Sequence, residues 1–161
     1  MIKLLITGGT IDKHYNEIKG ELDFSATHLP TMLAQARCHI ELDTQLLMLK
    51  DSLAMQQSDR EQIKQACINS EYQQIMITHG TDTMVETAQQ LASLASNKTI
   101  VLFGAMIPYS IKNSDALFNL GTAITAVQLL PAGVYISMNG KLFDWNKVRK
   151  DKQAGEFKAV G

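Results

Sequence analysis

A chain of 161 residues, 45% of them hydrophobic, is long enough to bury one sizeable core, so a single domain is the natural expectation. Charged residues make up 19% of the chain, the formal net charge is −1, and no basic block occurs, which argues against binding to nucleic acid. We therefore expect the partner to be a small molecule or another protein.

Short apolar runs alternate along the chain with stretches of helical periodicity. Strands are predicted, in chain order, over residues 2–6, 39–42 and 45–49 (one strand or a pair), 74–78, 99–103, 133–138 and 141–143. Helices are predicted over residues 29–37, 58–70, 84–95 and 115–129. The tail from Asp144 is polar and weakly patterned, and no element is predicted there.

Local signals support several of these boundaries. Ser58 with Glu61, and Thr83 with Glu86, have the spacing of a capping box at the start of a helix. Asn139-Gly140 predicts a tight turn between two strands. Strands that are apolar on both faces and alternate with helices indicate a parallel sheet with helices on both sides. We therefore predict one α/β domain over residues 1–161, with three layers doubly wound around a mostly parallel sheet of the flavodoxin or Rossmann kind.

The chain shows no sign of membrane insertion or of a metal site. The first apolar run ends at Thr7-Gly8-Gly9, too early for a secretion signal, and no segment holds the roughly 18 apolar residues of a transmembrane helix. Cys38 and Cys67 are too few for a disulfide framework and suit a reduced cytoplasm. The paired short spacings of a zinc site are missing, so neither a metal nor a cofactor is predicted.

Three loops follow predicted strands at the edge of the sheet where such folds bind ligands: residues 7–12, 78–83 and 104–108. Glycines at positions 8, 9 and 80 would let the backbone approach a ligand closely, and helix N-termini there favour an anion. A glycine pair after a strand is also a common tight turn. These glycines alone therefore leave both interpretations open.

Two threonines give the loops a possible chemistry. Thr10 and Thr81 each follow a glycine, and Asp82 comes next to Thr81. A threonine hydroxyl is a poor nucleophile until a base removes its proton, and a desolvated lysine beside an acid could relay that proton. The residue types alone do not select the lysine. They also leave open that Thr83 is only a helix cap and Asp82 only a first-turn charge.

Residues 7–11 (Thr-Gly-Gly-Thr-Ile) and 79–84 (His-Gly-Thr-Asp-Thr-Met) resemble the two signature motifs of the L-asparaginase/glutaminase family, the bacterial type with two catalytic threonines. The similarity continues through residues 104–108, 114–120 and 138–139, and corresponds to the family's larger N-terminal domain. The resemblance implies hydrolysis of L-asparagine to L-aspartate and ammonia through an acyl-enzyme, with glutamine a weaker or absent substrate.

The resemblance also implies roles for individual residues. Thr10 matches the nucleophile, while Thr81, Asp82 and a lysine match a second triad. Lys150 fits the expected spacing of that lysine after Met138-Asn139, better than Lys147 or Lys152. The implied substrate contacts are Ser52 for the α-carboxylate, Asp82 for the α-amino group, the carbonyl of Ala105 for the scissile amide, and the backbone at Gly9 and Gly80. The backbone N–H groups of Thr10 and Thr81 are the implied oxyanion donors.

Three departures from the family pattern predict weaker activity. The family's smaller C-terminal domain, which supplies an acid to a neighbouring subunit, has no counterpart in this sequence. Leu53 stands where a polar group often contacts the substrate amine. The loop tyrosine of the family aligns with Asp23-Phe24, so Tyr15, in the lid-like stretch 12–24, either replaces it or is a plain surface residue.

Two further function classes stay open besides the hydrolase. One is a non-catalytic or weakly active amino-acid-binding or regulatory module that retains the pocket. The other, a nucleotide-binding protein, is disfavoured because the glycine-rich turn lacks both a dinucleotide fingerprint and a P-loop. His79 is interpreted as a residue that orients its loop rather than as a general base. A homo-oligomer, a dimer or higher, is expected to cover the face left exposed.

Overall fold

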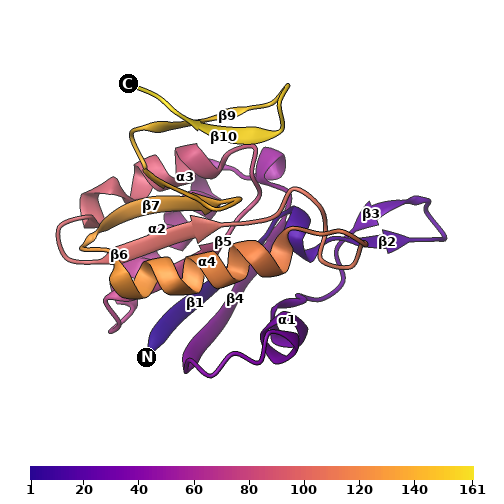
Figure 1. The fold of residues 1–161 in the computed structure, drawn as a ribbon, viewed down its shortest axis with the longest axis horizontal. Helices are drawn as coiled ribbons and strands as arrows, with labels where there is room; N and C mark the ends of the chain where they lie inside the picture. Colours follow the sequence, from indigo (N-terminus) through magenta and orange to yellow (C-terminus); the bar gives the residue numbers. More distant parts are fainter.

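The computed structural model describes residues 1–161, and its main feature is a six-stranded sheet in the order β4-β1-β5-β6-β7-β8 (Figure 1). The strands are β1 (Ile2–Gly8), β4 (Leu42–Lys50), β5 (Gln74–Thr78), β6 (Thr99–Phe103), β7 (Gly133–Met138) and β8 (Lys141–Asp144). Only the pairing of β7 with β8 is antiparallel, which confirms the predicted mostly parallel sheet. The carboxyl ends of β1, β4, β5 and β6 therefore meet at one edge.

Helices cover both faces of this sheet, as predicted. They are α1 (Leu29–Gln35), α2 (Gln57–Asn69), α3 (Met84–Leu91) and α4 (Ala116–Leu129). Successive side chains of a strand point to opposite faces. Ile75 and Ile77 of β5 accordingly pack in one core with α2 and α3, while Met76 packs in a second core with α1 and α4. All three side chains are fully buried, which is why the strand is apolar on both faces.

Two small hairpins lie outside the main sheet (Figure 1). The first joins β2 (His14–Asn16) to β3 (Glu21–Asp23) and projects from one end of the molecule. The second joins β9 (Val148–Asp151) to β10 (Glu156–Ala159), and β9 packs against α3. Neither was expected from the sequence, which predicted a plain loop and an unstructured tail. Strands of three or four residues contain too few alternating positions to produce a recognisable pattern.

Several predicted boundaries and helix caps were wrong. Residues 39–41 lie outside β4, which is one continuous strand. The capping box of α2 is formed by Gln56 and Asp59 rather than Ser58 and Glu61, because Asp59 accepts from the Gln56 backbone N–H at 2.8 Å. The hydroxyl of Thr83 does not cap α3, because it donates to the carbonyl of Ser52.

The turn at Asn139-Gly140 is confirmed. Both residues have positive φ angles, 51° and 84°, as a two-residue turn between antiparallel strands requires. Helix α3 ends at Leu91, earlier than predicted, and continues as a short 3-10 helix over Ala92–Leu94. No helix here combines the length and the apolar character that crossing a lipid bilayer demands.

Candidate active site

The loops after β1, β4 and β5 touch one another through their backbones. Gly9 has a φ of 79°, and a Cβ atom there would lie 2.4 Å from the backbone nitrogen of Gly80. A Cβ atom on Gly80 would in turn lie 2.7 Å from the Cβ and Oγ atoms of Ser52. Only glycine fits at either position, because such distances are far below van der Waals contact. The three loops thus form one continuous surface at the carboxyl edge of the sheet.

Thr10 stands at the start of a 3-10 helix, Thr10–Asp12, directly after the Gly8-Gly9 turn. The N–H groups of Asp12 and Lys13 donate to the carbonyls of Gly9 and Thr10, both at 3.1 Å, which fixes this turn. The side chain of Thr10 is partly exposed, and its hydroxyl forms no hydrogen bond within the chain. A hydroxyl so placed is accessible to a ligand at this edge of the sheet.

Thr81, Asp82 and Lys150 form a compact hydrogen-bonded group. Lys150 Nζ donates to Thr81 Oγ1 at 2.7 Å and to Asp82 Oδ1 at 2.8 Å. The side chain of Lys150 is only 12% exposed, so the ammonium group is largely shielded from water and paired with the Asp82 carboxylate. The structure therefore brings together three of the four residues predicted for the reaction centre. The fourth, Thr10, stands next to Gly9, whose backbone contacts the Thr81 loop.

The β9–β10 hairpin is what places Lys150. Lys150 pairs with Phe157 across the hairpin, and Phe157 is 2% exposed because it packs into the core beside α3. The other two lysines considered from the sequence are elsewhere. Lys147 Nζ lies 3.7 Å from Asp144 on the exposed surface, and Lys152 is exposed in the hairpin turn. Of the three, only Lys150 reaches Thr81.

Ser52 is buried in the loop after β4, in the 3-10 helix Ser52–Ala54. Its Oγ atom accepts from the backbone N–H of Thr83 at 3.2 Å, and its carbonyl accepts from the hydroxyl of Thr83 at 2.9 Å. A serine hydroxyl that accepts from an N–H still has its own proton to donate. Leu53, the next residue, is 67% exposed and offers no polar side-chain contact.

The loop that contains Ala105 is held by a carboxylate that the sequence suggested only as part of a motif. Asp115 accepts from the backbone N–H groups of Met106 and Ile107, all at 3.0 Å, and from Asn139 Nδ2 at 2.9 Å. Burial is the largest influence on Asp115 and raises its pKa, but the combined hydrogen bonds outweigh it and hold the pKa below its usual value. Asp115 is thus charged and fixes the backbone on the C-terminal side of Ala105.

The site depends on two further residues that sequence reasoning missed as functional positions, Asn119 and Asn139. Asn119 Nδ2 donates to the carbonyl of Gly104 at 2.9 Å, on the other side of Ala105, and to Asp115 Oδ2 at the same distance. Asn119 Oδ1 accepts from the backbone N–H of Asn139 at 3.0 Å. The only sequence signal was their place in the resembling segments 114–120 and 138–139. Together with Asp115 they join the loop after β6 to the turn after β7.

His79 is fully buried, with both ring nitrogens occupied. Nδ1 lies 2.7 Å from the carbonyl oxygen of Gly80, and Nε2 lies 2.7 Å from the hydroxyl of Thr87. Because a carbonyl oxygen can only accept, Nδ1 carries the proton and Nε2 accepts from Thr87. Burial lowers the pKa of His79 to about 4, so the ring is neutral near pH 7. This geometry agrees with a residue that orients the Gly80 loop and offers no free nitrogen for use as a base.

Tyr15 lies on β2 of the projecting hairpin and is 58% exposed. Its hydroxyl forms no hydrogen bond within the chain, so the structure does not connect it to the Thr81 group. The side chain of Phe24, at the end of the hairpin, lies instead near Lys13, whose Nζ atom is 5.7 Å from the centre of the ring. Nowhere do three His, Cys, Asp or Glu side chains come together in a way that would hold a metal ion.

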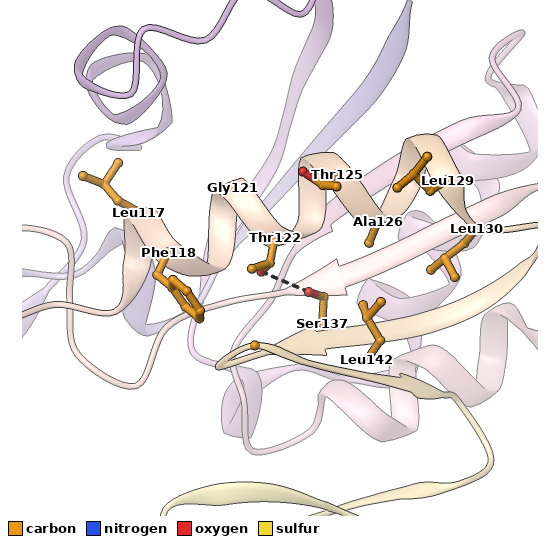
Figure 2. Close-up of a pocket in the computed structure, with 11 residues that line it drawn as sticks. Leu117, Phe118, Gly121, Thr122, Thr125, Ala126, Leu129, Leu130, Ser137 and Leu142 are labelled. Carbon is orange, nitrogen blue, oxygen red and sulfur yellow. Dashed lines mark hydrogen bonds between the residues drawn. The ribbon is translucent and has the colours of Figure 1, made fainter.

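A cavity of about 700 Å³ lies on another part of the molecule (Figure 2). It runs between α4 and the β7–β8 strands, and hydrophobic side chains such as Leu129, Leu130 and Leu142 line it. Its polar lining includes Thr122 and Ser137, whose hydroxyls lie 3.2 Å apart. None of the candidate catalytic or substrate-binding residues lines this groove.

The sequence and the fold match one group of known proteins. The model of the asparaginase N-terminal domain matches residues 1–160. The L-asparaginase of Thermococcus kodakarensis is 33% identical over 161 aligned residues, which cover 96% of this chain and 49% of that enzyme. One chain of the glutamyl-tRNA(Gln) amidotransferase of Methanococcus vannielii is 29% identical over 154 residues, which cover 89% of this chain and 35% of the amidotransferase chain.

Solved structures agree with these similarities. The Thermococcus kodakarensis L-asparaginase superimposes with a TM-score of 0.84 at 32% identity, covering 99% of this chain and 51% of that one. A probable cytoplasmic L-asparaginase from Campylobacter jejuni gives a TM-score of 0.82 at 28% identity, covering 98% and 52% respectively. The chain thus spans about half the length of the asparaginases that it matches.

Proposed function

This chain belongs to the asparaginase family, and we propose that it hydrolyses the side-chain amide of L-asparagine to L-aspartate and ammonia. The observation that carries the proposal is the contact of Lys150 Nζ with both Thr81 and Asp82, on the loop that touches Gly9 beside Thr10. Such a group supplies what amide hydrolysis needs near a hydroxyl nucleophile, namely a path for its proton.

In the proposed reaction Thr10 Oγ attacks the side-chain amide carbon of the substrate. Lys150 passes a proton to the Asp82 carboxylate and takes up the proton of the Thr81 hydroxyl, which accepts the proton of Thr10. The reverse transfers deliver a proton to the amide nitrogen, so that the C–N bond breaks and ammonia leaves. The backbone N–H groups of Thr10 and Thr81 stabilise the oxyanion. Water then cleaves the acyl-enzyme ester, which releases L-aspartate and restores the Thr10 hydroxyl.

The same loops supply the proposed contacts with the rest of the substrate. The Ser52 hydroxyl, which still has a proton to donate, binds the α-carboxylate, and Asp82 binds the α-amino group. The carbonyl of Ala105 accepts from the scissile amide, and the two glycines Gly9 and Gly80 let the substrate approach the backbone. Because Leu53 offers no polar contact, we expect the site to discriminate weakly between substrates with and without an α-amino group.

Ammonia release from L-asparagine tests the proposal. Replacing the nucleophile in Thr10→Ala should lower the rate at least about 100-fold, because no hydroxyl remains to form the acyl-enzyme. Thr31→Ala, which changes an exposed threonine on α1, is the matched control and should retain the wild-type rate. Equal ammonia release by wild type and Thr10→Ala would rule out Thr10 as the nucleophile.

A second candidate function is an amino-acid-binding or regulatory module that retains this pocket without turnover. The exposed Leu53 favours it, because the substrate amine lacks one of its usual partners. Thermal unfolding in the presence of L-aspartate and L-asparagine separates the two functions. A raised melting temperature without ammonia release would support the module, whereas ammonia release that depends on Thr10 would support the hydrolase.

We also propose a cytoplasmic homo-oligomer. The groove between α4 and β8 supports self-association, because Phe118 and Leu142, which line it, are 58% and 50% exposed, and a second copy could cover them. Sedimentation velocity tests the assembly, with Phe118→Glu as the variant that should weaken it. A species that stays monomeric at every concentration would contradict the proposal.

A further inference from the structure

Lys13, which follows the Thr10–Asp12 turn, is fixed by four contacts. Its backbone N–H donates to the carbonyl of Thr10 at 3.1 Å, and its carbonyl accepts from the hydroxyl of Ser110 at 2.8 Å. Its Nζ atom pairs with Asp51 Oδ2 at 2.5 Å and lies 5.7 Å from the centre of the Phe24 ring. The side chain is 18% exposed. A surface lysine is normally free to move, so this degree of fixation calls for an explanation.

Asp51, the partner of Lys13, directly precedes the proposed carboxylate-binding residue. One carboxylate oxygen faces Lys13 and the other accepts from the backbone N–H of Leu53 at 3.0 Å, which caps the 3-10 helix that starts at Ser52. The hydrogen bond from Lys13 is the main reason that the pKa of Asp51 is held below its usual value. On its other side Ser52 is fixed by Thr83. The position of the Ser52 hydroxyl therefore depends on both partners.

Lys13 is also the last residue before the projecting hairpin. The base of that hairpin is closed by Asp12, whose Oδ1 atom accepts from the hydroxyl of Thr27 at 2.9 Å and from the backbone N–H of His28 at 2.7 Å. Beyond this base the hairpin exposes its side chains, with Ile18 at 92%. Lys13 thus lies between this closed base and the exposed part of the hairpin.

We infer that Lys13 is a positioning residue for substrate binding: its ion pair with Asp51 joins the base of the β2–β3 hairpin and the Thr10 turn to the Ser52 loop. The inference rests on the proposed function, since it assigns the Ser52 loop to the substrate carboxylate. Lys13 forms no hydrogen bond with Thr81, Asp82 or Lys150. Its loss should therefore weaken binding of the substrate far more than it slows the chemical step.

The chain contains a closely matched control ion pair. Lys3 Nζ pairs with Asp43 Oδ2 at 2.9 Å, and these residues lie near the amino ends of β1 and β4, whereas Lys13 and Asp51 lie beyond the carboxyl ends of the same strands. The side-chain exposures of the Lys3 pair are 13% and 41%, against 18% and 41% for Lys13 and Asp51. The two pairs thus match in exposure, and only the Lys13 pair adjoins the Ser52 loop.

The test compares Lys13→Met, Lys13→Arg and Lys3→Met by the kcat and KM for L-asparagine, and by the Kd for L-aspartate. We expect Lys13→Met to raise KM and Kd about 10-fold, with kcat changed less than about threefold, because an ion pair at the binding loop is lost. Lys13→Arg should restore most of the affinity. Lys3→Met should leave KM and Kd unchanged, even if its melting temperature falls as much as that of Lys13→Met.

A double-mutant cycle with Asp51→Asn gives a second measurement. If the two residues act as a pair, Lys13→Met combined with Asp51→Asn should weaken binding no more than either change alone. Unchanged KM and Kd in Lys13→Met, an equal effect of Lys3→Met, or a fall in kcat alone would each overturn the inference. Failure of the proposed function is a different result: wild type would then release no ammonia, while the Kd for L-aspartate would still report on Lys13.

Discussion

Lys150 Nζ lies 2.7 Å from Thr81 Oγ1, although 69 residues separate the two in the chain. Thr81 follows the central strand β5, whereas Lys150 belongs to a small hairpin that forms no part of the main sheet. The contact therefore depends on how that hairpin packs against α3. In the candidate reaction centre, Thr81 and Asp82 thus follow a strand of the main sheet, whereas the position of Lys150 rests on the buried side chains of its hairpin.

Replacing this lysine should remove the proposed proton relay. We expect Lys150→Met to lower kcat for L-asparagine by about 10²- to 10⁴-fold, the usual range for the loss of a general acid–base group, with a smaller change in KM. Lys147→Met, which removes an exposed lysine of the same segment, is the matched control and should keep the wild-type kcat. Steady-state ammonia assays measure both, and a normal kcat in Lys150→Met would remove Lys150 from the mechanism.

The folding of the β9–β10 hairpin, which positions Lys150, should depend on its one large buried side chain, that of Phe157. Phe157 is 2% exposed, and Phe157→Ala should reduce the free energy of unfolding by about 3–5 kcal/mol, as expected for a cavity of this size. Urea denaturation measures this loss, and activity should fall as well, even under conditions where the variant stays folded. Ala159→Ser, at an exposed position of the same strand, should change neither stability nor activity. Full activity in folded Phe157→Ala would show that Lys150 does not depend on this packing.

The central strands could be predicted closely because their signal is local. The predicted ranges 74–78, 99–103 and 133–138 agree with β5, β6 and β7, since these strands are mostly buried and mostly apolar, as in the runs 75–77 and 100–103. The β9–β10 hairpin has no such pattern. Its buried residues are Val148 and Phe157, one on each strand, and only their packing against distant residues reveals them.

In the site, too, residues in short motifs could be predicted, whereas contacts between distant residues could not. Thr10, Thr81 and Asp82 could be selected from the sequence because they lie in short motifs directly after strands. The hydrogen bonds by which Asp115 fixes the loop around Ala105 could not be predicted, because their donors are backbone N–H groups eight and nine residues away. The prediction of the α2 cap failed for a similar reason. Asp59, which forms the cap with Gln56, is also fixed by an ion pair with Lys50 at 2.7 Å, and no local spacing indicates that pair.

Gly80 should tolerate no side chain. In Gly80→Ala the new Cβ atom would lie 2.7 Å from Ser52 Oγ and 2.9 Å from Ser52 N, so the Ser52 loop must shift. We expect a loss of about 1–3 kcal/mol in stability and a raised KM for L-asparagine. Gly121→Ala on α4 is the control, because nothing lies within 4 Å of its Cβ position and alanine favours a helix by up to about 1 kcal/mol. Unchanged stability and KM in Gly80→Ala would contradict the contact.

His79 should make the protein less stable as the pH falls. Its pKa is about 4 in the folded chain and near 6.5 when exposed, so between these values the unfolded chain binds a proton that the folded chain does not. This difference lowers the free energy of unfolding by about 2 kcal/mol from pH 7 to pH 5. The contribution of His79 is complete above pH 6.5 and is lost progressively down to about pH 4.

The variant His79→Gln isolates this effect. A glutamine amide can still donate to the carbonyl of Gly80 and accept from Thr87, but it does not titrate. Urea denaturation at pH 7, 6 and 5 should therefore show a smaller loss of stability in His79→Gln than in wild type, whatever the difference at pH 7. His39→Gln, which changes an exposed histidine, should follow the wild-type dependence. Equal slopes for wild type and His79→Gln would mean that the ring is protonated in the folded chain well above pH 4.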